Sequence, residues 1–90
     1  MTITKHAQVR MKQRSISPKL LQALIDFGNC RRSHSTNVLF LTREGLDDIR
    51  ATWERESYKL VERKRHAYVV IGDDGFIITA AYGRHRKKVA

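Results

Sequence analysis

The chain has 90 residues, enough for one domain with a small core, and 41 % of them are hydrophobic, which excludes a disordered tail. It carries 18 Lys and Arg against 9 Asp and Glu, a net charge of +9. A charge of this size exceeds what solubility alone requires. The sequence therefore favours a polyanionic partner, with nucleic acid ahead of a membrane surface.

Two further features bound the class of protein. No run approaches the roughly 20 apolar residues of a membrane span, and residues 1–10 lack the apolar core of a signal peptide. We therefore expect a cytoplasmic protein with no membrane partner. Cys30 is the only cysteine, which rules out an internal disulfide and a zinc cage. We expect it to be a small, half-buried residue at the start of a strand.

The first predicted helix, over residues 4–14, has two stripes of side chains spaced four residues apart. The apolar stripe, which we expect to be buried, consists of Ile3, Ala7 and Met11. The basic stripe beside it consists of His6, Arg10 and Arg14. A second helix follows, with Ser17 as its N-cap, Pro18 in its first turn and Gly28 as its terminator. Its leucines form a broad apolar face.

The middle of the chain predicts two strands and a long helix. The strands span residues 30–34 and 37–41, joined by a polar turn. Thr42 can cap a helix that runs from residue 43 to about residue 65, either unbroken or broken near Ser57.

The last unit is a hairpin. AYVVI and FIITAAY flank a Gly-Asp-Asp-Gly turn. Both arms are apolar at consecutive positions, so we expect both to lie in the centre of a sheet. The predicted fold is a single α+β domain over residues 1–90, with two N-terminal helices and a third helix packed on an antiparallel sheet of about four strands.

Metal and thiol chemistry are disfavoured. The adjacent pairs Asp47 and Asp48, and Asp73 and Asp74, suit cap and turn roles and do not have a spacing that converges on one ion. The four histidines are scattered along the chain. Cys30 could use His34 as a base only if that stretch were helical. We expect no metal and no cofactor.

Metal-free cleavage of RNA fits the residue types. The 2′-hydroxyl can attack its own phosphate if a base takes its proton, an acid protonates the leaving oxygen and cations stabilise the phosphorane. Histidine suits either proton transfer, and arginine matches phosphate oxygens. The two ends of the chain supply His6, Arg10, Arg14, Tyr82, Arg84, His85 and Arg86. Taken singly, His6, Arg10 and Arg14 also fit an ordinary solvated helix. Tyr82 also fits a cap on the core with its hydroxyl in water, and residues 84–88 also fit a basic tail.

Two segments, ITKHAQVRMKQRSIS with the helix after it that ends in Phe-Gly, and AYVVIGDDGFIITAAYGRHRKK, resemble a family of small bacterial proteins. Its members open with a Lys-His-Ala, Arg-Met, Arg signature and close with a hairpin before a basic segment. The resemblance covers residues 1–28 and 66–90, and the middle third matches in pattern only. The family is similar to RelE- and ParE-type toxins, and to the metal-independent ribonucleases that include barnase, EndoU and the tRNA-cleaving colicins.

This resemblance implies a RelE-like α+β fold with a curved antiparallel sheet and an RNA site at the sheet's open face. It assigns the signature histidine to His6, its arginines to Arg10 and Arg14, and the strand-end threonine to Thr79. Relatives often carry histidine or tyrosine at the position of Tyr82. The basic residues that follow match Arg84, His85 and Arg86.

The leading expectation is a toxin-like, metal-independent endoribonuclease of a toxin-antitoxin system. Its partners would be RNA, with ribosome-associated RNA and tRNA as candidate classes, and an acidic antitoxin protein. The catalytic candidates are His6, Tyr82 and His85. The candidates for binding RNA phosphates are Arg10, Arg14, Thr79, Arg84, Arg86 and Lys87.

Two alternatives stay open. The chain could be a non-catalytic basic module that binds nucleic acid or an acidic protein, as ParE-like proteins poison a protein target. It could also be an inactive family member whose charge serves a partner. Fold-level likeness does not decide among these.

Overall fold

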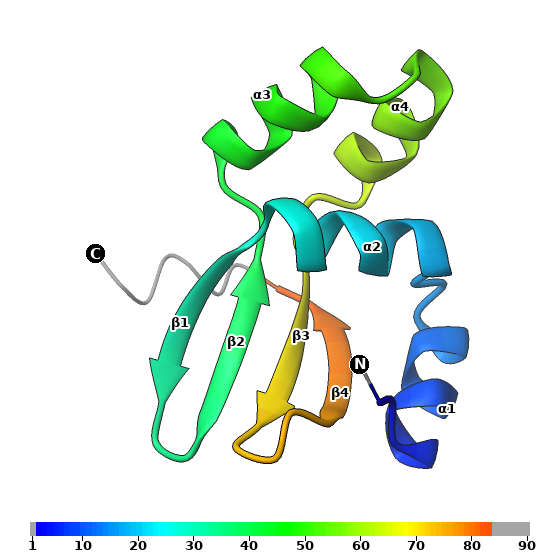
Figure 1. Cartoon of the computed structure of the whole chain (residues 1–90). Coiled ribbons are helices and arrows are strands. Elements are labelled where there is room, and N and C mark those ends of the chain that lie inside the picture. Colours follow the sequence, from blue (N-terminus) through cyan, green and yellow to red (C-terminus); the bar gives the residue numbers. More distant parts are fainter. Residues whose placement is uncertain (1, 84–90) are drawn as a thin grey trace.

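A computed structural model of the chain describes residues 2–83 (Figure 1). It contains four helices and four strands in that range. In chain order they are α1 (Lys5–Gln13), α2 (Pro18–Phe27), β1 (Asn29–Ser33), β2 (Thr36–Phe40), α3 (Arg43–Thr52), α4 (Arg55–Arg63), β3 (Ala67–Gly72) and β4 (Ile77–Tyr82).

The strands form one antiparallel sheet in the order β1-β2-β3-β4, which confirms the predicted α+β class. The expectation that both arms of the last hairpin lie centrally is right for β3 and wrong for β4, which forms an edge. Ile77 and Ala80 of β4 are buried although β4 is an edge strand, because the N-terminal segment and α1, instead of another strand, pack beside it. A bulge at Val70 and Ile71 shifts the pairing of β3 with β4.

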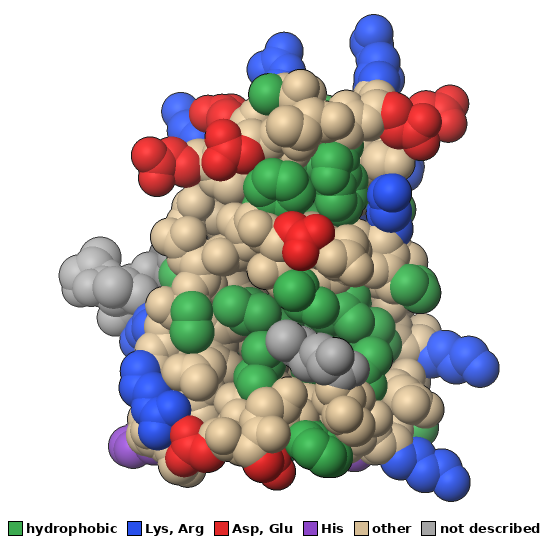
Figure 2. Space-filling model, viewed as in Figure 1, with side chains coloured by type: hydrophobic (Ala, Val, Ile, Leu, Met, Phe, Trp, Pro, Cys, Tyr) green, Lys and Arg blue, Asp and Glu red, His purple; other side chains and the backbone are tan. Residues whose placement is uncertain are grey.

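One face of the sheet carries the core. Val69 and Ala80 pair across β3 and β4, and both are fully buried. Leu20 and Leu24 of α2 are equally buried and belong to the same cluster. In Figure 1, α2 crosses the upper end of the sheet. Figure 2 shows hydrophobic side chains gathered in the middle of the viewed face, between α2 and the strand turns.

The start of α1 is attached to the start of β4. Ile3 forms a parallel bridge with Ile77, whose N–H donates to the Thr2 carbonyl at 2.8 Å. The N–H and the hydroxyl of Thr4 both donate to the Ile77 carbonyl, at 3.1 and 3.0 Å. The Thr4 hydroxyl also accepts the N–H of Ala7 at 3.1 Å, so it caps α1. One side chain therefore begins the helix and fixes it to the sheet edge.

From this attachment α1 runs along β4 and buries its predicted apolar stripe. Ala7 is fully buried, Met11 is 8 % exposed, and the partly buried Ile3 packs against them. Ser17 and Thr42 cap α2 and α3 as predicted, each accepting an N–H three residues on at 3.2 Å.

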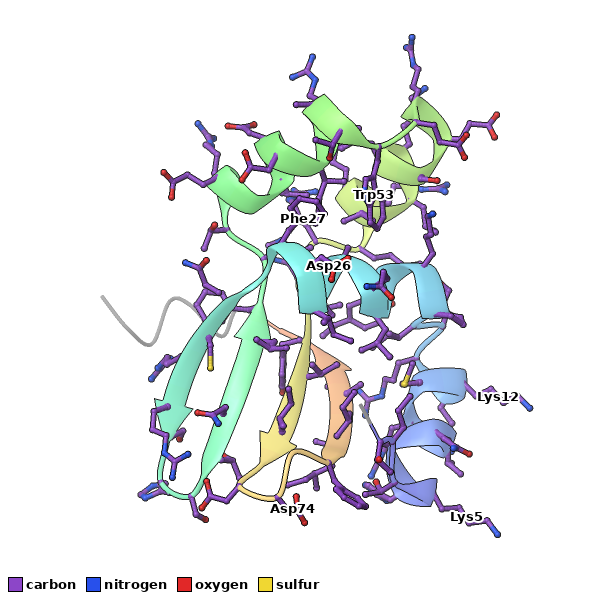
Figure 3. All side chains as sticks on the ribbon, viewed as in Figure 1. Lys5, Lys12, Asp26, Phe27, Trp53 and Asp74 are labelled. Atoms are coloured by element: carbon purple, nitrogen blue, oxygen red, sulfur yellow. The ribbon has the colours of Figure 1, made fainter. Side chains whose placement is uncertain are left out.

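The long helix predicted over residues 43–65 is two helices, and the break is at Trp53 and Glu54 instead of near Ser57. Both residues have extended backbone. The indole of Trp53 meets the ring of Phe27 edge to face, with ring centres 5.8 Å apart (Figure 3). The Lys19 ammonium lies 4.7 Å from the centre of the Trp53 ring. The helical backbone therefore ends at the residue whose side chain packs against α2.

The first hairpin differs from the prediction in its strand bounds and in the burial of Cys30. Its strands begin and end one residue earlier than expected, and His34 lies in the turn with a φ of 55°. Cys30 is exposed on β1, so the expected half-burial is wrong. Its strand partner Leu39 packs on the core. Cys30 itself lies on β1, which is the sheet edge opposite β4 and α1.

No helix within residues 2–83 is long and apolar enough to cross a membrane.

The attachment of α1 predicts a stability effect. Replacing Thr4 by Ala removes a cap and a bond to β4, so we expect the free energy of unfolding to fall by about 1–2 kcal/mol. Thr52→Ala is the matched control, because the Thr52 hydroxyl is exposed and bonds only within its own helix. It should change stability by less than about 0.5 kcal/mol in urea unfolding followed by circular dichroism. Equal losses of unfolding free energy in the two variants would contradict the role assigned to Thr4.

Candidate nucleic-acid interface

Acidic residues are absent from both ends of the chain. Residues 1–25 and 75–90 contain no Asp or Glu, and seven of the nine acids lie between Asp26 and Glu62. In Figure 2 the acidic side chains accordingly gather around α3 and α4, beside α2 and at the strand turns. The field of α1 is therefore positive, and no acid on its own helix offsets it.

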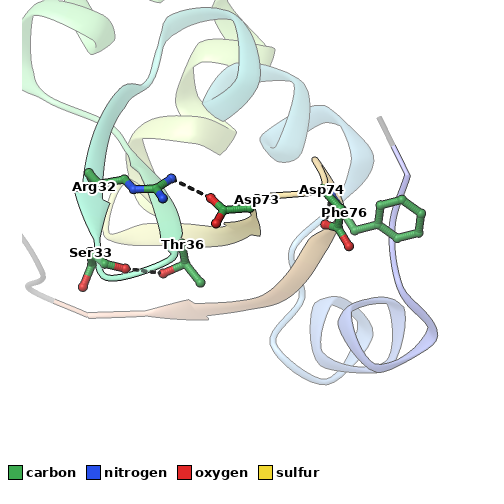
Figure 4. Close-up of polar contacts among 6 residues, drawn as sticks. All are labelled: Arg32, Ser33, Thr36, Asp73, Asp74 and Phe76. Atoms are coloured by element: carbon green, nitrogen blue, oxygen red, sulfur yellow. Dashed lines mark hydrogen bonds and ion pairs between the residues drawn. The ribbon is translucent and has the colours of Figure 1, made fainter.

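The remaining two acids, Asp73 and Asp74, have turn roles. The Asp73 carboxylate pairs with the Arg32 guanidinium at 2.7 Å and joins the two hairpin ends (Figure 4). Asp74 accepts the N–H of Phe76 at 3.0 Å. Among residues 2–83, the pair of Arg32 with Asp73 is the one salt bridge. The cations of α1 thus have no carboxylate partner within the described chain.

The side chains of α1 form two edges on either side of the buried stripe. At about 100° per residue, His6, Arg10 and Arg14 follow one edge, as the four-residue spacing predicts. Lys5, Val9 and Lys12 belong to the other side. Arg10 is half-buried, whereas His6 and Arg14 are exposed. We call the first set the arginine edge. It offers two guanidinium groups and an imidazole along one line.

Tyr82 lies at the opposite end of α1 from His6. The chain begins α1 beside Ile77, and the Tyr82 hydroxyl reaches the Ser15 carbonyl at 3.4 Å, just past the end of the helix. The helix rise separates His6 from Arg14 by about 12 Å along the axis. The structure therefore brings Tyr82 close to the Arg14 end of the arginine edge and not to His6.

Thr79 lies on the other face of the sheet. It pairs with Val70, while the buried Ala80 pairs with Val69 on the core face. Tyr82 pairs with Ala67 and shares that core face. Thr79 and Tyr82 thus point to opposite sides of β4, and the sheet does not bring them together.

Ser15 and Lys64 complete the surroundings of Tyr82, and sequence reasoning missed both. The Lys64 ammonium donates to the Ser15 carbonyl at 2.6 Å, so this oxygen accepts from the residue that follows α4 and from Tyr82 of β4. Ser15 has a φ of 55°, the left-handed region. No local motif marks this junction, because its partners are 49 and 67 residues away from Ser15 in the sequence.

The environment of Tyr82 affects its ionisation. Burial disfavours the charged phenolate and raises the pKa of Tyr82 above its ordinary value of 10.0. The ordinary value already makes the hydroxyl neutral near pH 7, and burial reinforces this. It can donate a hydrogen bond or a proton, but it cannot act as a general base there.

The remaining candidates, Arg84, His85, Arg86 and Lys87, lie outside the described residues. Gly83, the last described residue, donates its N–H to the His66 carbonyl at 2.9 Å. Within residues 2–83, no three His, Cys, Asp or Glu side chains are grouped so that they could hold a metal ion. The extended backbone of β1 also removes the helical arrangement that Cys30 would need to use His34 as a base.

The raised pKa of Tyr82 predicts a pH dependence. The fold favours the neutral phenol, so this contribution to stability is complete below pH 10.0 and is lost as the pH rises through the higher folded-state pKa. Titration of tyrosinate absorbance in the native protein should show a component above pH 10.0 that Tyr82→Phe removes and Tyr58→Phe retains. If the titration component above pH 10.0 is still present in Tyr82→Phe, the raised pKa does not belong to Tyr82.

Three comparisons with known proteins give no relatives: no protein-family model, no curated protein and no solved structure matches the chain.

Proposed function

We propose that the protein is a toxin-like endoribonuclease that binds RNA along α1 and cleaves it without a metal ion. The observation that carries this proposal is the alignment of α1 with β4. Contacts at both ends, from Thr4 to Ile77 and from Tyr82 to Ser15, hold the arginine edge beside the strand that leads into the basic C-terminal segment. The acid-free helix α1 and the acid-free strand β4 are thereby neighbours.

The separation of His6 from Tyr82 guides the assignment of roles. His6 lies about 12 Å along the helix axis from Arg14, whereas Tyr82 contacts Ser15 at the Arg14 end, and proton transfer needs contacts of about 3 Å. We assign the chemistry to the Tyr82 end, where Tyr82 is a neutral donor and His85 follows three residues later in the sequence. Imidazole can accept the 2′-hydroxyl proton, and the phenol can donate to the phosphate or to the leaving oxygen.

The arginine edge then holds the RNA. Arg14, at the Tyr82 end, would contact the scissile phosphate, and Arg10 and His6 would contact nucleotides further along the strand. Arginine is suited to this role because its fork donates two hydrogen bonds to phosphate oxygens. In this scheme His6 is a binding residue.

The second candidate function is a non-catalytic RNA-binding module. It is favoured by the fact that His6, Thr79 and Tyr82 do not converge on one point. This module would use the same arginine edge and the same charge but would leave its substrate intact.

RNA cleavage in EDTA separates the two functions. We expect the wild-type protein to cleave a single-stranded RNA oligomer, and His85→Ala to slow cleavage by about 10²- to 10⁴-fold, the usual contribution of an acid or base. His6→Ala should weaken binding only a few-fold. Intact RNA after long incubation with the wild-type protein would reject the nuclease in favour of the binding module. Equal defects in the two histidine variants would refute the assignment of roles.

Salt dependence tests the arginine edge. Replacing Arg10 and Arg14 by Gln should lower RNA affinity and reduce the slope of log K against log salt by about one to two, because each phosphate contact contributes close to one. Arg55→Gln with Arg63→Gln on α4 is the matched control, with the same loss of charge. An equal change in the control pair would show that only net charge matters.

A further inference from the structure

A groove of about 670 Å³ runs along the side of α1 that faces away from the arginine edge. It extends from the N-terminal segment to the start of α2 and to the end of α4. Its lining includes Val9, Met11 and Ile16, which are apolar, and Lys5, Lys12 and Lys64, which are basic. Its size falls within the range of binding clefts.

The floor of the groove is apolar. Met11 and Ile16 are 8 % and 4 % exposed and connect it to the core. Val9 lies at its side and is 49 % exposed, more than any other large hydrophobic residue of the described chain. About half of the Val9 surface remains in water after folding, and a partner that covers it would gain the burial of that remaining apolar area.

The rim of the groove is basic. Lys5 and Lys12 are seven residues apart on one side of α1, and Lys64 lies at the far end; no acid is among the lining residues. Figure 3 shows Lys5 and Lys12 extending from α1 away from the rest of the molecule. Lys64 donates to the neutral Ser15 carbonyl, which leaves its charge uncompensated. A positive rim around an apolar floor is complementary to an acidic amphipathic surface.

We propose that this groove binds an acidic amphipathic helix of a partner protein. Two to three turns of helix match the length of α1, about 13 Å, and leucine-like side chains on one face would cover Val9 and Ile16. Carboxylates on both flanks would reach the lysine rim. A second copy of this chain fits less well, because it would bring two lysine rims together. RNA fits the arginine edge better, since phosphates gain nothing from an apolar floor.

This inference gives the acidic partner of the proposed function a site, but it needs neither RNA binding nor cleavage. The groove and the arginine edge lie on opposite sides of the stripe formed by Ala7 and Met11. A partner in the groove would therefore leave His6, Arg10 and Arg14 accessible.

The test uses a synthetic fluorescent peptide of about 14 residues, with leucine at i, i+3, i+4 and i+7 spacing and glutamate elsewhere. A scrambled peptide of identical composition is its control. Fluorescence anisotropy with the 90-residue chain should give at least tenfold tighter binding of the patterned peptide. Equal binding of both peptides would overturn the proposal, because it would show attraction to net charge alone.

Two variants locate the binding site. Val9→Gln removes the exposed apolar side chain and should weaken binding of the patterned peptide at least fivefold. Lys5→Glu with Lys12→Glu should weaken this binding at least tenfold. Arg55→Glu with Lys59→Glu on α4 changes the net charge equally and should have a much smaller effect. An equal loss in this control pair would reject the groove.

The other occupants give distinct results. If sedimentation shows a dimer that Val9→Gln dissociates, a second copy covers the groove and the proposal is wrong. If the groove variants weaken binding of a single-stranded RNA oligomer as strongly as they weaken binding of the peptide, the groove is part of the RNA-binding surface and the proposal is also wrong. Retained RNA cleavage in variants that have lost the peptide would support it and would leave the nuclease proposal intact.

Discussion

The arrangement of the molecule depends on one short attachment, the pairing of residues 2–4 with Ile77. The sheet edge at β4 would otherwise present free backbone groups to solvent. Thr4 satisfies the Ile77 carbonyl and caps α1 with the same hydroxyl, so strand pairing and helix initiation occur at one point. Because α1 then runs along β4, the position of every side chain on α1 relative to the sheet follows from this contact.

This attachment explains how a small basic protein can have two different surfaces on one helix. The buried stripe of Ala7 and Met11 faces the core, and the residues on either side of it form separate edges. Arginines and an imidazole, suited to phosphates, lie on one edge. Lysines around an apolar floor, suited to an acidic helix, lie on the other. The proposed RNA and protein partners thus do not compete for the same side chains.

Local sequence signals predicted most of the fold. Ser17 and Thr42 cap helices as their residue types indicate, and the Gly-Asp-Asp-Gly turn joins β3 and β4. The errors arise where tertiary packing decides. The helix break at Trp53 depends on Phe27, which belongs to another helix, and β4 lies at the edge because distant residues cover it.

The candidate site also combines features set by local sequence with features set by tertiary packing. The four-residue spacing of His6, Arg10 and Arg14 predicted one edge of a helix, because that spacing is a property of the helix itself. The meeting of Tyr82 with Ser15 and Lys64 had no local signal, since three separate elements contribute to it. The distance between His6 and Tyr82 likewise depends on the direction in which α1 runs along β4.

The most direct test of the account is an NMR titration of isotopically labelled protein with a single-stranded RNA oligomer. We predict that the amide shifts of His6, Arg10, Arg14 and residues 82–83 change together, while those of α3 and α4 stay constant. Shift changes centred on α3, α4 or β1, with α1 unaffected, would contradict the claim that α1 and the end of β4 form one RNA-binding surface.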